Sequence, residues 1–288
     1  MVDRRDIVSD LVGPSLARGA LLLAALLAGE ALADAPSQAS QASQASQAQW
    51  LLEPLDEPVP EARAHYLISN EARHDLFAAA IADRGGAYLG VGADQNYTLL
   101  AVSRAERAYI IDHDRKILEL HRELGRRIVA AASPEALLGG LLDPSDPAPA
   151  SLADVWPMLA QHLGRVAARR HDGRASTWLG DPALYTFVRD RWRYGEIHLV
   201  LGDLVGDTSM PSIAAAATAR NLRFSVVYVS NAEDTLSAPE RLAARLRALP
   251  RAADAVLLRT VGGGAEPAAD GLWSYQIQRI GGPGGEVR

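Results

Sequence analysis

Residues 85–114 read GGAYLGVGADQNYTLLAVSRAERAYIIDHD. A short apolar run at 87–89 leads into a turn that contains Gly90 and Gly92, and a helix is expected to follow. A second apolar run, 108–111, ends at Asp112. Glycines let the backbone turn sharply and approach a ligand closely, and the start of the helix offers free N–H groups. A carboxylate about 20 residues further on can accept hydrogen bonds from a ribose, so the stretch predicts the front half of a nucleotide-binding α/β unit.

The rest of the chain continues this alternation of strands and helices. Apolar runs at 197–201, 224–229 and 255–261 predict further strands, and the alternating pattern at 272–280 predicts a final, antiparallel strand. The expected fold class is therefore α/β, with a mostly parallel sheet and helices on both faces. Ligands bind such sheets at the carboxyl ends of the strands. These ends are polar or glycine-rich here, at 90–96, 112–114, 202–207 and 230–233.

Two segments add to this core. A helix is expected over 69–82, with Ser69 or Asn70 as its N-cap. Residues 133–192 interrupt the alternation before the third strand and are interpreted as an insertion rich in helix and in aromatic residues, which gather at 178–192. The aromatic residues fit either the packing of a small helical subdomain or a lid over the cleft.

The glycine turn favours one kind of nucleotide-binding unit. A dinucleotide fingerprint has a third glycine where Gln95 stands, which argues against an NAD-dependent oxidoreductase. The run instead resembles the first motif of class I S-adenosylmethionine (SAM) methyltransferases, an acid-x-Gly-x-Gly-x-Gly pattern. Gly90 and Gly92 match this motif, Tyr88 replaces its acid, and Asp94 replaces its last glycine.

The resemblance to class I methyltransferases covers residues 66–280 and implies a Rossmann-like, methyltransferase-type fold with SAM as cofactor. In that family Asp112 would bind the ribose, and Asp203, in the pair Gly202-Asp203, would contact the adenine. More specifically, the chain resembles a family of uncharacterised exported bacterial proteins with this fold. The matching pieces are Ile68-Ser-Asn-Glu71, Tyr88-Leu-Gly-Val-Gly-x-x-Gln-Asn96, Gly202-Asp-Leu204, Tyr228-Val-Ser-Asn-x-Glu233 and Leu257-Leu-Arg-Thr260.

The candidate site residues form three groups, and each has a structural alternative. The cofactor-binding group is Gly90, Gly92, Gln95, Asn96, Asp112 and Asp203. The catalytic group is Asn231, which could hold a nucleophile, and Glu233, which could act as a general base if burial raises its pKa. The substrate cleft is expected to include Asn70, Glu71 and Ser230. The alternative roles are helix capping and turn formation, to which Asp, Asn, Gln and Ser are equally suited.

Composition excludes several classes of protein. The chain has 288 residues, a formal net charge of −6 and no cysteine, so disulfides, thiolate catalysis and cysteine-bound metals are excluded. The basic residues are scattered, whereas nucleic-acid binding normally needs a positive stripe. His113 lies between Asp112 and Asp114, but neighbouring residues at a strand end point in opposite directions, so no metal site is expected.

The N-terminal region predicts export. Arg4, Arg5 and Arg18 precede an apolar run at 19–29, and small residues at 31–35 resemble a cleavage site, so residues 1–35 are predicted to be a signal peptide. The apolar run is too short for a permanent membrane anchor. Residues 36–64 read as a Ser/Gln/Ala tether and lead-in, 65–282 as the α/β domain, and 283–288 as a disordered tail. If the N-terminus is not a functional signal peptide, the expected location is the cytoplasm instead.

Two functions follow from these observations. A small-molecule ligand is the expected partner, and the second function also admits a protein partner. The first is SAM-dependent methyl transfer to an unknown acceptor, with SAM on the cofactor-binding group and the acceptor near Asn231 and Glu233. The second is an exported, non-enzymatic binding module that keeps the methyltransferase fold without SAM chemistry. The first is the leading expectation, and low SAM availability outside the cytosol, together with the replaced motif residues Tyr88 and Asp94, makes the second nearly equal to it.

Overall fold

The computed structural model describes residues 54–57, 66–234, 236, 238–262 and 271–280. The predicted signal peptide, the Ser/Gln/Ala tether and the C-terminal tail lie outside these residues. The described residues, from Pro54 onward, belong to one compact unit of the chain. Among them, no helix combines the length and the apolar character that crossing a lipid bilayer requires.

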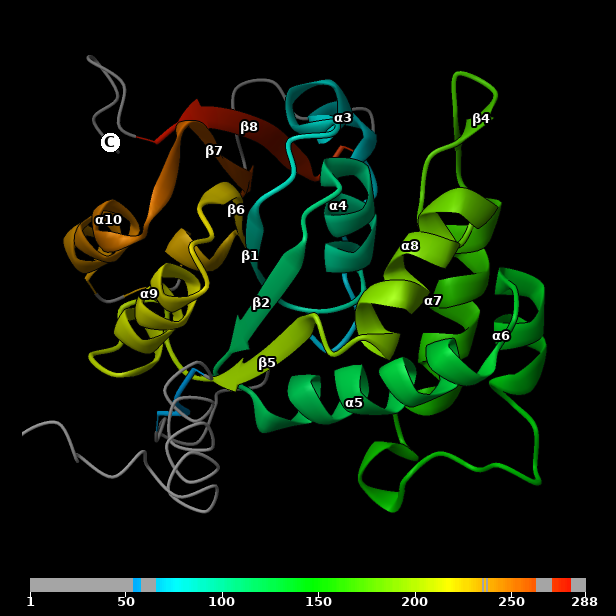
Figure 1. The fold of residues 1–288 in the computed structure, drawn as a ribbon. Coiled ribbons are helices and arrows are strands. Elements are labelled where there is room, and N and C mark those ends of the chain that lie inside the picture. Colours follow the sequence, from blue (N-terminus) through cyan, green and yellow to red (C-terminus); the bar gives the residue numbers. More distant parts are fainter. Residues whose placement is uncertain (1–53, 58–65, 235, 237, 263–270, 281–288) are drawn as a thin grey trace, which may run out of the picture. The chain divides into compact units, whose positions relative to one another are not determined.

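A six-stranded sheet forms the centre of this unit, in the order β5-β2-β1-β6-β7-β8 (Figure 1). The first five strands in this order run parallel to one another, and the last is antiparallel to β7. The strands are β1 (Ala87–Val91), β2 (Arg107–Asp112), β5 (Ile197–Leu201), β6 (Phe224–Ser230), β7 (Arg251–Gly262) and β8 (Trp273–Arg279). The predicted α/β, Rossmann-like class is confirmed, and the strand order reverses at β1, where such folds bind ligands.

Side chains of successive strand residues point to opposite faces, and each face is covered by helices (Figure 1). Tyr88 and Ile110 belong to the apolar core on one face, and Leu89 and Ile111 to the core on the other. The first face is covered by α3 (Asp75–Ile81), α4 (Gln95–Ser103), α5 (Arg115–Ala130) and the insertion, and the second by α9 (Ser209–Ala219) and α10 (Pro239–Ala248). Because both faces of the inner strands are buried, β1, β2 and β6 are nearly continuous apolar runs.

The helix expected over 69–82 is shorter than predicted. It begins at Asp75, with His74 as its N-cap, so Ser69 and Asn70 do not cap it. Ser69 Oγ instead accepts a hydrogen bond from the backbone N–H of Glu71 at 3.2 Å. Residues 66–74 therefore form an irregular segment without helical hydrogen bonds. Contacts with other parts of the chain hold this segment in place.

The insertion consists of helices and one small hairpin. Its elements are α6 (Pro134–Gly140), η1 (Ala150–Leu152), α7 (Trp156–Ala168), β3 (Arg170–His171), β4 (Arg174–Ala175) and α8 (Pro182–Arg193). Trp178 is fully buried and meets Tyr97 of α4 edge-on, with ring centroids 5.0 Å apart, while Tyr185 stacks on it at 6.1 Å. The aromatic residues thus join the insertion to the core, as the packing interpretation predicts.

Residues 54–57 lie against the carboxyl end of β5 and the start of α9. The carboxylate of Glu57 accepts hydrogen bonds from the backbone N–H groups of Asp207, Thr208 and Ser209 at 2.9–3.3 Å, and from Ser209 Oγ at 2.8 Å. The first N–H groups of a helix have no partner within the helix and attract negative charge. Burial alone would raise the pKa of Glu57, but the hydrogen bonds from Ser209 and its neighbours hold it below its usual value.

We expect Glu57→Ala to lower the free energy of unfolding by about 1–2 kcal/mol at pH 7, as loss of a helix N-cap does. Because the pKa of Glu57 is depressed in the folded protein, its contribution is present above its unfolded pKa of about 4.3 and is lost as the pH falls through the folded value. Urea unfolding of the full chain at pH 7 and in acid measures both effects. Equal unfolding midpoints of Glu57→Ala and the wild type at pH 7 would contradict the capping role.

Candidate functional site

The glycine turn after β1 is filled by the side chain of Asn96. The amide Nδ2 of Asn96 donates to the carbonyl oxygens of Val91 and Ala93, both at 2.8 Å, and its Oδ1 accepts from Tyr88 Oη at 2.8 Å. A Cβ atom placed on Gly90 would lie 1.9 Å from Asn96 Oδ1. Glycine is therefore required at 90, but the space it leaves is occupied by the protein itself.

Asp112 and His121 hold the other side of this turn. Asp112 is 5 % exposed; its Oδ2 accepts from the backbone N–H of Gly92 at 3.1 Å, and its Oδ1 accepts from that of Asp114 at 2.8 Å. The Nε2 of His121 lies 2.8 Å from the carbonyl oxygen of Gly92, so it donates there, and its Nδ1 accepts from Tyr97 Oη at 2.7 Å. Burial lowers the pKa of His121 and favours this neutral form.

These contacts test whether SAM fits the predicted cofactor-binding group. A ribose would have to reach Asp112, whose carboxylate is buried and whose two oxygens each bind a backbone N–H. A Cβ atom on Gly92 would lie 2.7 Å from Gln95 Nε2, so neither glycine of the turn opens onto empty space. In the arrangement observed, the residues do not fit SAM.

The remaining predicted residues lie in separate places. Asp203 Oδ1 accepts from the backbone N–H of Val205 at 3.0 Å, within its own turn. Glu233, in the short helix η2 (Ala232–Asp234), accepts from Arg259 of β7 at 2.8 Å. Asn70 is exposed, and Asn231 is half-buried next to Ser230. Of the predicted cleft residues, the structure brings Glu71 and Ser230 into direct contact.

Glu71 is the centre of a buried hydrogen-bond network at the carboxyl ends of β6 and β7. Its Oε2 accepts from Tyr228 Oη at 2.6 Å and from His74 Nε2 at 2.9 Å. Its Oε1 accepts from Ser230 Oγ and from Thr260 Oγ1, the latter at 2.8 Å. Four donors thus converge on a carboxylate that is 3 % exposed.

This network keeps Glu71 ionised. Burial alone would raise the pKa of Glu71, but the hydrogen bond and the charge of His74, together with the hydroxyl groups of Ser230 and Tyr228, hold it below its usual value. Burial and the negative charge of Glu71 in turn raise the pKa values of Tyr88 and Tyr228 well above their usual range. The two tyrosines are therefore neutral donors at physiological pH.

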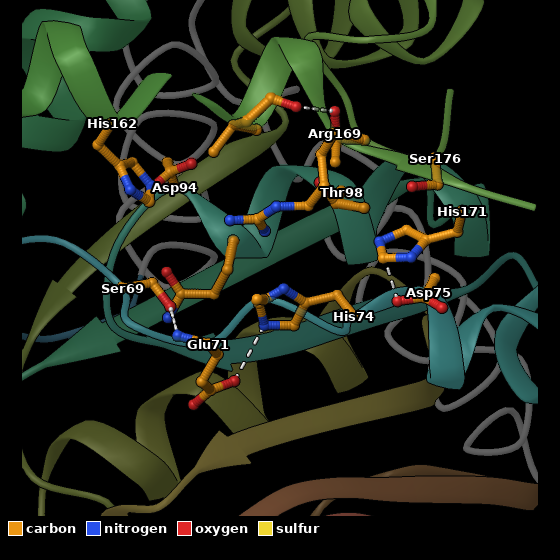
Figure 2. A pocket seen from close by; sticks show the side chains of 14 residues that line it. Ser69, Glu71, His74, Asp75, Asp94, Thr98, His162, Arg169, His171 and Ser176 are labelled. Atoms are coloured by element: carbon orange, nitrogen blue, oxygen red, sulfur yellow. Dashed lines mark hydrogen bonds and ion pairs between the residues drawn. The ribbon is translucent and has the colours of Figure 1, made fainter. Parts of the chain in front are cut away.

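A pocket lies beside this network, between the segment that precedes α3, the start of α4, and the insertion (Figure 2). It is narrow, since the space between its side chains holds about one water molecule, and part of it is open to solvent. Its lining residues are Ser69, Glu71, Ala72, His74, Asp75, Asp94, Gln95, Thr98, His162, Val166, Arg169, His171, Ser176 and Thr177. Two of the predicted site residues, Glu71 and Gln95, are among them.

Each carboxylate of the pocket is paired with a histidine. In addition to the Glu71–His74 pair, His162 Nε2 of α7 lies 2.9 Å from Asp94 Oδ1, and His171 Nε2 lies 3.1 Å from Asp75 Oδ1 (Figure 2). Burial alone would raise the pKa of Asp94, but the charge of His162 and its hydrogen bond hold it below its usual value. Asp94 thus takes the place of the last glycine of the resembled motif and holds the insertion against the glycine turn.

Sequence reasoning missed most of this pocket. His162 lies on the apolar face of α7, between the buried residues Leu159 and Val166, where a histidine needs a partner. That pattern, together with an acid where the resembled motif has glycine, was a usable signal for the Asp94–His162 pair. Arg169 and Ser176 gave no such signal, because only the fold of the insertion brings them to the pocket.

Comparisons with known proteins extend these findings. The fold is that of an α/β, Rossmann-like protein. Within this class the chain belongs to the family described as "Domain of unknown function (DUF7790)", whose model matches residues 66–146 and 145–282. No curated protein matches the chain in sequence.

Solved structures similar to the chain include two methyltransferases. The rRNA methyltransferase aviRa from Streptomyces viridochromogenes is 16 % identical, with a TM-score of 0.37 over 78 % of this chain and 88 % of its own. The glycopeptide N-methyltransferase MtfA, complexed with sinefungin, is 14 % identical, with a TM-score of 0.32 over 85 % of this chain and 71 % of its own. Similarity at this level says nothing of activity.

Proposed function

We propose that the protein is a non-enzymatic binding module that keeps the Rossmann-like fold without SAM chemistry. The observation that carries this proposal is the closed glycine turn, in which Asn96 fills the space beside Gly90 and Asp112 binds two backbone N–H groups. The ligand site of the proposed module is the pocket of Figure 2, which combines buried charged pairs with access to solvent. The predicted signal peptide agrees with the proposal, since SAM is not expected to be plentiful outside the cytosol.

SAM-dependent methyl transfer is the second candidate. It is favoured by the position of Asp112, which ends β2 and lies within hydrogen-bonding distance of Gly92, where the resembled family places its ribose-binding acid. In that case a rearrangement of Asn96 and Asp112 would have to free both for the cofactor. The observed arrangement does not fit SAM and therefore supports no step of methyl transfer.

Calorimetric titration of the full chain with SAM and S-adenosylhomocysteine, with NAD as a control, separates the two candidates. The binding module is expected to give no saturable heat up to about 1 mM, the upper end of typical enzyme KM values. Micromolar binding of SAM that is lost in Asp112→Ala would overturn the proposal and support a methyltransferase.

Substitution of Asp112 gives an independent expectation. Asp112→Ala leaves the partly buried N–H groups of Gly92 and Asp114 without their common acceptor, so the free energy of unfolding should fall by about 1–3 kcal/mol in total. The matched control is Asp114→Ala, which removes only the N-cap of α5 and should cost about 1 kcal/mol. Thermal melts of both variants measure the difference. A melting temperature of Asp112→Ala equal to that of the wild type would indicate a carboxylate kept for a ligand.

A further inference from the structure

We propose that the pocket of Figure 2 binds a small carboxylate whose α-carbon carries a hydrogen-bond donor, that is, an α-hydroxy or α-amino acid. This inference rests on the proposed function, because it assigns a ligand class to the pocket of the binding module. Three polar groups of the pocket lining carry it: the guanidinium of Arg169, the side-chain oxygen of Gln95 and the hydroxyl of Ser176.

Arg169 supplies the anion-binding group. It follows the last residue of α7 and is held through its backbone N–H, which donates to the carbonyl oxygen of Val166 at 3.2 Å. Its side chain extends into the pocket (Figure 2). Among the described residues its guanidinium has neither an ion pair nor a hydrogen bond, although the residue is half-buried. A planar guanidinium has five N–H donors in a fork that matches a carboxylate, so a ligand carboxylate is its natural partner.

The carboxylates of the pocket do not fill this role. Glu71 and Asp94 are bound by His74 and His162, and Asp75 accepts two hydrogen bonds from Arg73, both at 2.9 Å, in addition to its contact with His171. Each acid thus has its own partners, and the guanidinium of Arg169 remains available for a ligand.

Gln95 and Ser176 supply the remaining specificity. Gln95 is 7 % exposed, and its Oε1 is buried without a hydrogen-bond partner in the part of the chain that the structure describes. Ser176 Oγ is likewise buried and unpartnered there. A buried polar atom without a hydrogen-bond partner is unfavourable, and a ligand can supply the missing partner. An amide oxygen only accepts, so the ligand must bring an O–H or N–H to Gln95, while the hydroxyl of Ser176 can donate to the ligand carboxylate.

The size of the pocket limits the ligand. With Arg169 in the observed position, the space between the side chains holds about one water molecule. Even an acid of two or three carbon atoms, which needs the least rearrangement, does not fit in this arrangement. Arg169, which no partner among the described residues fixes, has to swing aside to admit it. A rotation of one long side chain is compatible with a site that is otherwise formed.

The test is a calorimetric titration of the full chain with glycolate, glycine, acetate and inorganic phosphate. Glycolate or glycine is expected to bind with a Kd of about 1 mM or tighter, and acetate, which lacks the α-donor, about tenfold more weakly. Absence of saturable binding by any of the carboxylates overturns the inference, and tighter binding of phosphate overturns its choice of a carboxylate.

Three variants assign the contacts. Arg169→Gln should weaken binding of both glycolate and acetate by about tenfold or more, whereas Gln95→Met should weaken glycolate to the level of acetate and leave acetate unchanged. The matched control Arg165→Gln removes the same charge from an exposed position of α7 that does not line the pocket, and should bind like the wild type. An equal loss in Arg165→Gln, or none in Arg169→Gln, overturns the assignment; thermal melts show that each variant is folded.

The two proposals fail in distinguishable ways. SAM binding that depends on Asp112 overturns the binding-module proposal, whatever the carboxylates do. A folded protein that binds neither SAM nor any of the small carboxylates overturns only the ligand class inferred for the pocket. Carboxylate binding that is lost in Arg169→Gln, with no SAM binding, supports both.

Discussion

Replacing Glu71 by alanine is expected to lower the free energy of unfolding by about 3–5 kcal/mol, the cost of breaking a buried charged pair by removing one partner. The loss is large because four donors, from His74, Tyr228, Ser230 and Thr260, lose one common acceptor that is almost fully buried. Folded domains have only about 5–15 kcal/mol of stability, so the variant should unfold at a clearly lower urea concentration. Glu71→Gln keeps the shape and two acceptor sites and should lose less.

The effect of Glu71 should also depend on pH. Since its folded pKa is depressed, its contribution is present above the unfolded pKa of about 4.3 and disappears as the pH falls through the folded value. The difference in unfolding free energy between the wild type and Glu71→Gln is therefore expected to be constant near neutral pH and to shrink in acid. Glu119→Ala, at a half-buried position of α5, is the matched control and should change stability by less than about 0.5 kcal/mol. A pH-independent difference for Glu71→Gln would contradict the ionised state.

The second large effect is expected from the Asp94–His162 pair. Asp94→Ala leaves His162 buried without its acceptor, His162→Ala leaves a buried carboxylate, and each should cost about 3–5 kcal/mol. The pair joins the start of α4 to α7, so the loss should reach the docking of the insertion as well as the local contact. Urea unfolding of the full chain measures the loss in each variant.

A double-mutant cycle tests whether Asp94 and His162 act together. The double variant should lose less than the sum of the single losses, by about 0.5–3 kcal/mol, because neither partner is then left unpaired. Asp190→Ala, at a half-buried position of α8 outside the pocket, is the control and should stay within about 0.5 kcal/mol of the wild type. Strictly additive losses would show that Asp94 and His162 are held by other contacts.

The layout of the fold was predictable because it depends on local patterns. The strand at 197–201 was predicted to the residue, and the final strand was expected to be antiparallel, as β8 is. Apolar runs broken by glycine and proline determine such elements without knowledge of the partners. The helix expected over 69–82 was the main error, because capping residues at 69 and 70 have the right chemistry for a helix start but serve a turn instead.

The site was predicted less well, for a physical reason. A motif shows which residues are near a ligand in other proteins, but whether a carboxylate faces a ligand or a backbone N–H depends on atoms that come from elsewhere in the chain. Asp112 and Asn96 had the right positions for a cofactor site, yet both bind the glycine turn itself. Glu71 was expected in a cleft, and only the folded sheet brings it to Tyr228, Ser230 and Thr260.

The sequence by itself thus determined the α/β class, the order of the elements, the insertion and the glycine turn, because each follows from residues that are close together in the chain. The tertiary structure decided that the turn is closed, that Glu71 and Asp94 are buried in charged pairs, and that Arg169, Gln95 and Ser176 share one pocket. The pocket joins residues more than 100 positions apart, from Ser69 to Thr177, and such contacts arise only when burial of the core brings distant segments together.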